Sequence, residues 1–376
     1  MPGYLNRPGD TGSQRKKMKA IQLEQFTNDV SELILADVEK PTPEPGQVLV
    51  NMRYSAINPS DFNFIRGDYQ SALSRLMWNK NIPENSPGSQ LAFEPTGQVL
   101  HARTPYIPGG EGVGIVEGNG GGFLAKRLMG KRVAINAGPP MGTWQQYTVV
   151  DAKRAVVVPA ELDDHQAAMY LVNPLSSYAM VKDVLDVQPG RWLMLSGAGS
   201  ALSQMVIRMA QLDGFKTIAV VRGGHKTQLL KKLGANVVIE TDSMDLSSEV
   251  YAATTGTGVD YVMDCIGGEL LEQMQRCVTV NGHILVYGTL SGPSCTMYSR
   301  DLMMPCARIS GFFAGNWLAQ KTLLQKMMIL RKIARLAKAG IFKTQVDEIY
   351  ALDEYQRALE AASQSGRDGK VLFKNE

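Results

Sequence analysis

Cysteine and histidine are scarce in this chain, with four of each among 376 residues. The cysteines are Cys265, Cys277, Cys295 and Cys306; no two form a Cys-x-x-Cys pair, and all lie in the second half. This distribution excludes a secreted disulfide framework and favours a reducing compartment. The histidines are scattered without the spacing of metal ligands, so the sequence predicts no bound metal.

An excess of charge of either sign is also missing. The 39 basic and 36 acidic residues leave a net charge of +3, which is too small to predict nucleic acid or an anionic membrane as a partner. No uninterrupted apolar run is long enough to span a bilayer. Hydrophobic residues make up 44% of the chain, enough for an ordinary core, and the length predicts two or three domains.

The first 17 residues are polar and rich in glycine, proline and basic side chains, so we expect a disordered extension at 1–17. An apolar signal-peptide core is absent from it. The basic residues leave a mitochondrial transit peptide open as an alternative, but the prolines, the glycines and Asp10 make a poor amphipathic helix. The sequence therefore favours the cytoplasm, with mitochondria as the alternative.

Short alternating runs bounded by turns dominate the chain as far as residue 160. We expect strands at 18–23, 32–37, 47–55, 111–117, 132–136 and 145–150. In the third of these, Val48, Val50 and Met52 share one face. A long segment of mixed helical and turn character follows Tyr69. The pattern is compatible with a small β-barrel.

The pattern changes after Glu161 to strands that alternate with helices. Helices are expected at 163–170, 174–184, 226–233, 246–254, 270–277 and 318–338, and strands at 237–240, 261–265, 284–287 and 308–313. Alternation of this kind predicts a parallel doubly wound sheet. The tail, 348–373, is expected to hold one helix and a final strand, 370–373, that returns to the first domain.

Residues 192–222 carry the strongest functional signal. An apolar run ends in the small-residue turn Ser196-Gly197-Ala198-Gly199-Ser200-Ala201, a helical pattern follows, and a second apolar run ends at Arg222. Such a βαβ unit brings a dinucleotide pyrophosphate to backbone N–H groups at a helix N-terminus. An arginine at the end of the second strand suits the 2′-phosphate of NADPH.

Each part of this signal has a structural alternative. A Gly-x-Gly-x-x-Gly fingerprint would need glycine at position 202, which is Leu202. A glycine-rich turn that binds nothing, and a solvated surface role for Arg222, both stay open from this segment alone.

The chain resembles the zinc-independent medium-chain dehydrogenase/reductase superfamily from Met18 onward, and most closely the 2-enoyl thioester reductases of the mitochondrial enoyl-CoA/acyl-carrier-protein type. The motifs that carry the resemblance are at 45–48, 57–69, 108–114, 142–144, 172–178, 196–201, 233–235 and 264–268, together with Arg222. The resemblance implies an α/β protein with a GroES-like β-rich catalytic domain at 18–160 and 316–376, and a Rossmann doubly wound parallel-sheet domain at 161–315.

Zinc-dependent relatives place a cysteine near position 56 and a histidine just before Glu111, where this chain has Ala56 and Gly110. No thiolate or imidazole is available there for a catalytic zinc. The reaction implied is hydride transfer from NADPH to the β-carbon of a trans-2-enoyl thioester, followed by protonation of the α-carbon. A quinone or another enone is the alternative acceptor, and a non-catalytic nucleotide-binding protein is a third hypothesis.

The resemblance gives roles to individual residues. Tyr69 is implied as the general acid, against a pocket-lining alternative, and Asn58 as a catalytic residue that orients the nicotinamide or a hydroxyl network, against a turn-stabilising one. Trp144 is expected in the substrate pocket. The implied cofactor contacts are Asn173, Ser176, Gly197, Gly199, Ser200, Ala201, Leu202, Arg222, Lys226, Cys265, Gly267, Tyr287, Gly288, Phe312 and Phe313. For Asn173 and Ser176, N-capping of a helix is an equal competitor.

Several positions depart from the family pattern. Ser203 replaces a common glycine, Phe313 a common tryptophan, and Gln70 a usual proline; the segment 71–106 is longer than usual and would lie beside the substrate. The implied partners are an enoyl-CoA or an enoyl acyl-carrier protein as substrate, and a second copy of the chain in a homodimer joined at the edge of the Rossmann sheet.

Overall fold

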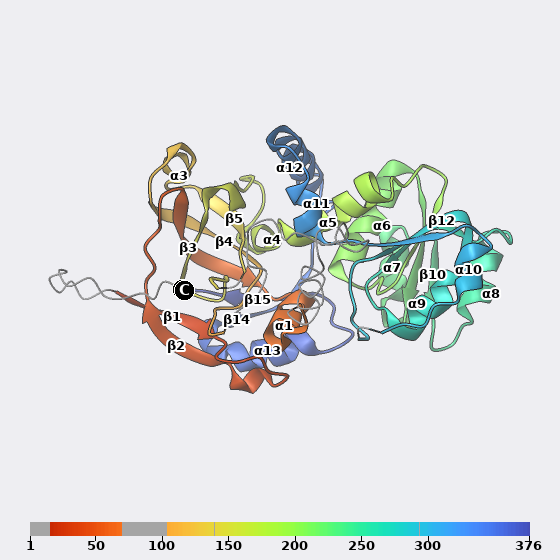
Figure 1. Ribbon diagram of the computed structural model, residues 1–376, viewed down its shortest axis with the longest axis horizontal. Coiled ribbons are helices and arrows are strands. Elements are labelled where there is room, and N and C mark those ends of the chain that lie inside the picture. The colour runs from red at the N-terminus through yellow and green to blue at the C-terminus, as the bar shows by residue number, and fades with distance from the viewer. Residues whose placement is uncertain (1–15, 70–103, 139, 293) are drawn as a thin grey trace, which may run out of the picture.

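The computed structural model describes residues 16–69, 104–138, 140–292 and 294–376. Figure 1 shows two lobes side by side: one contains the first and last parts of the chain, and the other contains the middle. The expected segment 71–106 lies mostly outside the described residues, as does most of the expected extension 1–17. Among the helices that the structure describes, none is long and apolar enough to cross a membrane.

The first lobe is built on a seven-stranded sheet. Its strands are β3 (Gln47–Ala56), β4 (Glu111–Asn119), β5 (Arg132–Asn136), β6 (Tyr147–Asp151), β7 (Ala155–Val157), β14 (Val346–Ala351) and β15 (Lys370–Lys374), in the order β14-β15-β3-β4-β5-β7 with β6 also paired to β3. A separate antiparallel pair joins β1 (Lys17–Gln22) to β2 (Ile34–Glu39). Val48, Val50 and Met52 are all fully buried, which confirms the predicted face of β3. The α-helices that the structure describes in this lobe are α1 (Pro59–Arg66), α3 (Phe123–Leu128) and α13 (Tyr355–Ser363).

The second lobe holds six parallel strands with helices between them. The strands are β8 (Trp192–Leu195), β9 (Lys216–Val221), β10 (Val237–Glu240), β11 (Val259–Asp264), β12 (Val278–Val286) and β13 (Arg308–Gly311), in the order β10-β9-β8-β11-β12-β13. The connecting helices are α6 (Ala201–Asp213), α7 (Thr227–Leu233), α8 (Leu246–Ala253), α9 (Gly268–Gln275) and α10 (Ser299–Met303). The strand order reverses between β8 and β11, where doubly wound sheets bind ligands. The predicted doubly wound sheet is confirmed.

Four helices lie where the lobes meet: α4 (Asp164–Ala168), α5 (Val172–Ala179), α11 (Ala314–Ala319) and α12 (Leu323–Lys338). α5 starts two residues earlier than predicted and continues into a π-helical turn at Met180–Val184. The single helix expected at 318–338 is two helices. The first ends at Ala319 with Gln320 as its C-cap, and Thr322 caps the second, because its hydroxyl accepts from Gln325 N while Gln325 Oε1 accepts from Thr322 N. That capping box was the overlooked signal.

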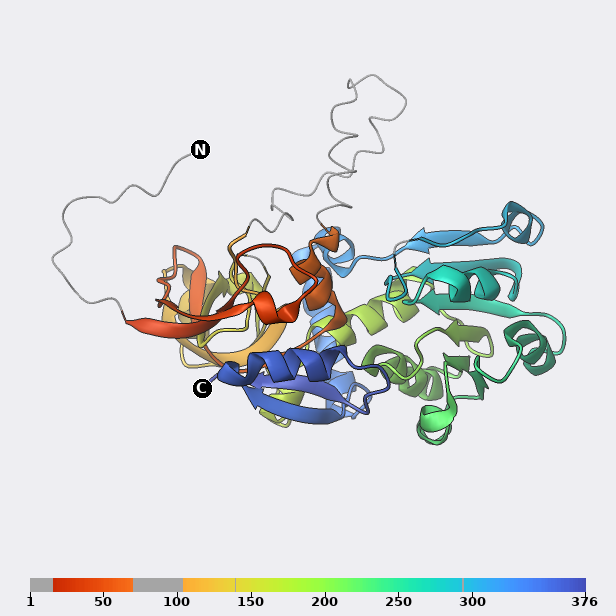
Figure 2. The ribbon, with the colours of Figure 1, turned by 90° about the horizontal axis from the view of Figure 1, so that it is seen from below.

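The C-terminal strand returns to the first lobe, as predicted, and pairs antiparallel with β3. Sequence reasoning missed β14, which pairs with β15 in parallel while α13 connects the two. β14 shows no alternation of buried and exposed residues, so it carried no strand signal. In Figure 2 the dark-blue helix α13 lies across this lobe, and the orange helix α1 lies at the junction between the lobes.

Candidate functional site

The turn between β8 and α6 lies at the carboxyl edge of the parallel sheet. Gly197 has a φ of +53°, and a Cβ there would lie 2.8 Å from Cys265 Sγ. A Cβ at Gly199 would lie 2.8 Å from Lys226 Cδ. Both positions need glycine because the turn packs closely against its neighbours. The first-turn N–H groups of α6 open toward this edge, the arrangement that receives a pyrophosphate.

Ser200 caps α6, and this accounts for Ser203. The Ser200 side chain accepts a hydrogen bond from Ser203 N at 3.2 Å and donates one to Ser203 Oγ at 3.0 Å. Ser203 is fully buried. Burial raises the pKa of the Tyr287 phenol well above its ordinary value, and the Ser203 hydroxyl works against that rise. The serine that replaces glycine is thus buried and hydrogen-bonded to the residue that caps α6.

Asp264 joins two of the strand ends, and sequence reasoning did not single it out. Its carboxylate accepts hydrogen bonds from Ser196 Oγ at 2.6 Å, Ile266 N at 3.1 Å and Gly267 N at 2.9 Å. Burial raises its pKa although these three donors oppose the change. Asp264 therefore holds the turn after β8 against the turn after β11.

The turns after β11 and β12 complete this edge. Burial raises the pKa of the Cys265 thiol to about 11, so the thiol is not a nucleophile at neutral pH. Gly267 has a φ of +76° and precedes α9, and a Cβ at Gly288 would lie 2.8 Å from Cys265 O. The backbones of Cys265 and Gly288 therefore approach each other closely, so the turns after β11 and β12 pack together.

Arg222 follows β9 and is exposed. Among the described residues its side chain has no hydrogen bond or ion pair, so the guanidinium is free to take an anion. Lys226 differs: it is buried, and its Nζ contacts Gly199 O at 3.4 Å and Arg367 O. Burial lowers its pKa. Lys226 thus holds the loop before β15 against the glycine turn rather than extending beside Arg222.

Phe312 and Phe313 follow β13 at the same edge, Phe312 packed against the main core and Phe313 48% exposed. With them, the predicted contacts of the second lobe other than Lys226 stand at a strand end, in the turn after it or, for Ala201 and Leu202, in the first turn of α6. The fold brings these segments to one edge because parallel strands all end there.

α5 joins the two lobes through its first turn. The backbone N–H of Val172 donates to Glu111 Oε2 at 2.9 Å, and Glu111 belongs to β4 of the other lobe. A carboxylate at a helix N-terminus is favoured by the helix dipole. Asn173 and Ser176 lie within α5 and do not cap it, since Leu171 is the N-cap residue and its side chain makes no capping bond. The capping alternative for these two residues is therefore wrong.

Asn58 is the centre of a buried polar cluster. Its Nδ2 donates to Glu111 Oε1 at 3.0 Å, and its Oδ1 accepts from Lys370 Nζ, which also donates to Ile57 O at 3.2 Å. Asn58 N donates to Asp61 Oδ2 at 2.7 Å. Burial raises the pKa of Asp61 to about 7 and that of Glu111, and lowers that of Lys370 to about 8. Asn58 thus has both ends of its amide bonded inside the protein.

Tyr69 follows α1 by three residues. Its hydroxyl oxygen accepts a hydrogen bond from Asn63 Nδ2 at 3.2 Å, and its ring packs edge-on against Phe64 at 4.8 Å between centroids. Burial raises the pKa of the phenol, and Asp61 and Asp68 raise it further, while Asn63 works against them. The phenol is therefore protonated at neutral pH and holds a proton to donate.

Trp144 lies elsewhere than expected. Its side chain has no exposed surface, its indole N–H donates to Ala56 O at 3.4 Å, and its ring packs edge-on against Phe373. A side chain with no exposed surface packs inside the lobe and cannot line an open pocket. In this structure Trp144 anchors β15 against β3 from within the core.

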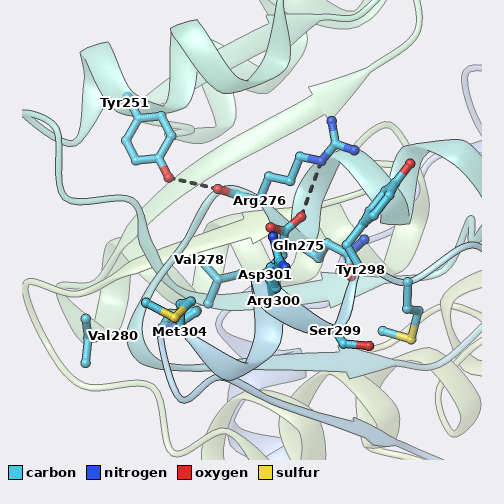
Figure 3. A pocket seen from close by; sticks show the side chains of 12 residues that line it. Tyr251, Gln275, Arg276, Val278, Val280, Tyr298, Ser299, Arg300, Asp301 and Met304 are labelled. Atoms are coloured by element: carbon cyan, nitrogen blue, oxygen red, sulfur yellow. Dashed lines mark hydrogen bonds and ion pairs between the residues drawn. The ribbon is translucent and has the colours of Figure 1, made fainter.

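A groove of about 1070 Å³ lies in the second lobe, away from these residues (Figure 3). Its lining includes Val278, the first residue of β12, so it opens at the amino edge of the sheet. Arg276 stacks over the Tyr298 ring at 4.6 Å and pairs with Asp301 at 3.4 Å. The groove therefore stands apart from the predicted cofactor edge.

A dinucleotide fits the carboxyl edge on the chemistry of the residues present: a glycine turn that a Cβ would fill, a helix N-terminus and the free Arg222 cation. Within the described ranges, no three His, Cys, Asp or Glu side chains group so as to hold a metal ion.

Two family models match the chain. One, described as alcohol dehydrogenase GroES-like domain, matches residues 44–160, and the other, described as zinc-binding dehydrogenase, matches residues 201–330. The mitochondrial enoyl-[acyl-carrier-protein] reductase of Dictyostelium discoideum is 23% identical over 330 residues, which cover 87% of this chain and 85% of that protein. The protein of the same name from Caenorhabditis elegans is 25% identical over 364 residues, 95% of each.

Solved structures of other proteins share the fold of this chain. A Bacillus thuringiensis protein described as an NADPH:quinone reductase matches with a TM-score of 0.82 and 28% identity, over 96% of this chain and 100% of that one. A 2-haloacrylate reductase matches with a TM-score of 0.75 and 21% identity, over 95% and 99%. The second likeness shows the fold alone.

The buried carboxyl of Asp61 predicts a pH dependence of stability. Its pKa is about 7 in the folded chain, against a usual 3.8. Between these values the unfolded chain has lost the proton that the folded chain keeps, so the free energy of unfolding falls as pH rises from 4 to 7. This fall in the free energy of unfolding is at most about 4 kcal/mol. We expect Asp61→Asn to remove it, as measured by urea unfolding at several pH values from 4 to 8. The exposed Asp353→Asn is the control; a difference from wild type that is the same at every pH would contradict the assignment.

Proposed function

The chain belongs to the medium-chain dehydrogenase/reductase superfamily of oxidoreductases, and from that premise we propose that it reduces the α,β double bond of a trans-2-enoyl thioester with NADPH. The observation that carries the proposal is the protonated, half-buried phenol of Tyr69, held by Asn63 at the end of α1. The curated relatives named as enoyl reductases, which span most of this chain, support the same acceptor.

When bound, NADPH supplies the hydride, which goes to the β-carbon of the enoyl group. Tyr69 then gives its proton to the α-carbon, directly or through a water that it orients. Asn63 Nδ2 donates to the phenol oxygen and so stabilises the negative charge that forms as the proton leaves. The thioester carbonyl polarises its own double bond, so this step needs no Lewis acid from the chain.

Asn58 acts as a positioning residue in this scheme. Its side-chain amide is bonded to Glu111 and Lys370, and its N–H to Asp61, so it fixes the first turn of α1. Because Glu111 also bonds Val172, the same network fixes the start of α5, where Asn173 and Ser176 are proposed to meet the nicotinamide half of the cofactor.

The proposed acid predicts a specific loss of turnover. Tyr69→Phe removes the proton but keeps the ring on Phe64, so we expect kcat with crotonyl-CoA to fall about 10²- to 10⁴-fold with little change in KM. Tyr147→Phe, in β6, is the matched control. Unchanged kcat in the Tyr69 variant would sink the general-acid role.

A quinone is the second candidate acceptor, because the Bacillus thuringiensis structure is described as a quinone reductase. The two acceptors are separated by assaying crotonyl-CoA and a benzoquinone with the same enzyme. Turnover of the quinone alone would replace the thioester proposal.

Arg222 is proposed to select NADPH. Arg222→Ala removes the free cation after β9, so we expect KM for NADPH to rise at least about tenfold while KM for NADH stays nearly unchanged, since one charge-assisted bond contributes about 1.5–3 kcal/mol. Lys231→Ala, an exposed cation on α7, is the control. Equal effects on both cofactors would mean that Arg222 does not contact the 2′-phosphate.

We also propose a homodimer joined at the edge of the parallel sheet. β13 is the terminal strand of that sheet, and an exposed pair, Met303 and Met304, lies close before it in the chain. Met304→Asp should halve the mass seen by light scattering, whereas Leu212→Asp, at an exposed apolar position on α6, should not.

The relatives named above are mitochondrial in name, which supports the alternative location, mitochondria, for this chain.

A further inference from the structure

The segment around α12 is the most one-sidedly charged part of the chain. No aspartate or glutamate occurs from residue 302 to residue 346, while Lys321, Lys326, Arg331, Lys332, Arg335, Lys338 and Lys343 all lie within it. The whole chain is nearly balanced, with 39 basic and 36 acidic residues. The local excess therefore creates a positive field on one element.

The outward face of α12 combines this charge with exposed apolar side chains. Ile333, Leu336 and Ala337 are buried on the opposite side. At 100° per residue, the outward face carries first Leu323, Leu324, Met327 and Met328, between 42% and 72% exposed, and then Arg331 and Arg335. We call these six residues the α12 patch. Figure 1 shows α12 standing clear at the junction of the two lobes.

The two arginines of the α12 patch have no partner in the part of the protein that the structure describes, whereas three lysines near the patch do. Lys321 pairs with Asp183, Lys338 pairs with Glu161, and Lys332 lies over the Tyr178 ring. Arg331 and Arg335 form no hydrogen bond or ion pair with any residue that the structure describes. Like charges four residues apart on a helix destabilise it slightly, so an acidic partner would relieve an unfavourable contact as well as add favourable ones.

We propose that the α12 patch docks an acidic acyl-carrier protein that presents the enoyl thioester to this enzyme. The inference rests on the proposed function and names its substrate carrier. The apolar half of the patch would bury against an apolar spot of the carrier, and Arg331 and Arg335 would meet its carboxylates.

Two other occupants fit the patch less well. A helix lying in a membrane surface separates its apolar and cationic side chains around its axis, whereas here both kinds share one face and follow each other along the axis. A second copy of the chain would bring the same face to itself, and a self-complementary contact has no carboxylate on this helix to meet the arginines.

The position of α12 suits a carrier. α12 packs against α5, which holds the predicted cofactor contacts Asn173 and Ser176, and Lys332 reaches the Tyr178 ring of α5. A carrier protein that sits beside the active site, with its acyl group on a flexible arm, needs such a surface. Coenzyme A, which brings no protein with it, does not.

The test compares one acyl group on two carriers. Steady-state kcat/KM is measured with crotonyl-loaded acyl-carrier protein and with crotonyl-CoA for Arg331→Glu with Arg335→Glu, and separately for Leu324→Ser with Met328→Ser. We expect each pair to lower kcat/KM at least tenfold with the carrier protein, and the serine pair to leave crotonyl-CoA unchanged. The wild-type rate with the carrier should also fall more steeply with salt than the rate with crotonyl-CoA.

The matched control is Lys126→Glu with Arg127→Glu on α3. These cations are exposed beside the exposed Phe123, but on a helix far from α5, and their reversal should leave both substrates unaffected. Equal losses with carrier and coenzyme, or no loss with the carrier, would overturn the proposal. So would wild-type binding to anionic phospholipid vesicles that the α12 variants lose while carrier kinetics stay normal, or a change in oligomeric mass caused by the serine pair.

The docking surface can be separated from the proposed reaction. If the wild-type enzyme reduces no enoyl thioester, binding of the unloaded carrier protein is measured by titration calorimetry. Binding that is lost in Arg331→Glu with Arg335→Glu and retained in the α3 variant would support the docking proposal although the proposed reaction fails. Absence of binding would overturn the docking proposal as well as the proposed reaction.

Discussion

The carboxylate of Glu111 is the contact on which the arrangement of the two lobes depends. One oxygen accepts from Asn58 in the first lobe and the other from the first turn of α5 at the junction. A buried charge costs several kcal/mol unless it is paired and hydrogen-bonded. Lys370, which donates to Asn58, supplies a nearby opposite charge that works against the burial that raises the pKa of Glu111, and it comes from the last strand of the chain. Each of these groups depends on the others for a partner, so the elements that carry them are fixed together.

This network explains how segments far apart in the chain are held together. α1 precedes Tyr69, β4 carries Glu111, α5 carries Asn173 and Ser176, and β15 carries Lys370. The proposed acid of one lobe can face a cofactor proposed to bind the other lobe only if the two lobes keep a fixed position relative to each other. The polar cluster fixes that position although it buries charged groups, whereas the glycine turn and Asp264 order the carboxyl edge of the parallel sheet through backbone packing and hydrogen bonds.

Two features of the outer surface lie apart from the candidate site. The groove of Figure 3 lies at the amino edge of the sheet, and the α12 patch lies beside the junction. Neither contains a group that the proposed reduction needs. Both expose apolar side chains next to arginines, a combination common at protein interfaces. Met304, which lines the groove, belongs to the proposed contact with a second copy, and the α12 patch is the proposed contact with the substrate carrier.

The sequence by itself determined the parallel sheet and the residues at its carboxyl edge, because hydrophobic periodicity shows the strands and every parallel strand ends at the same edge. It also indicated the return of 370–373 and the position of Arg222 at the end of a strand. Only the tertiary structure decided what depends on contacts between distant segments: the burial of Trp144 against Phe373, the engagement of Lys226 with the loop before β15, the role of Asp264, and the cluster of Asn58, Glu111 and Lys370. These pairs are far apart in the chain, and no local pattern records which side chains will share a buried space.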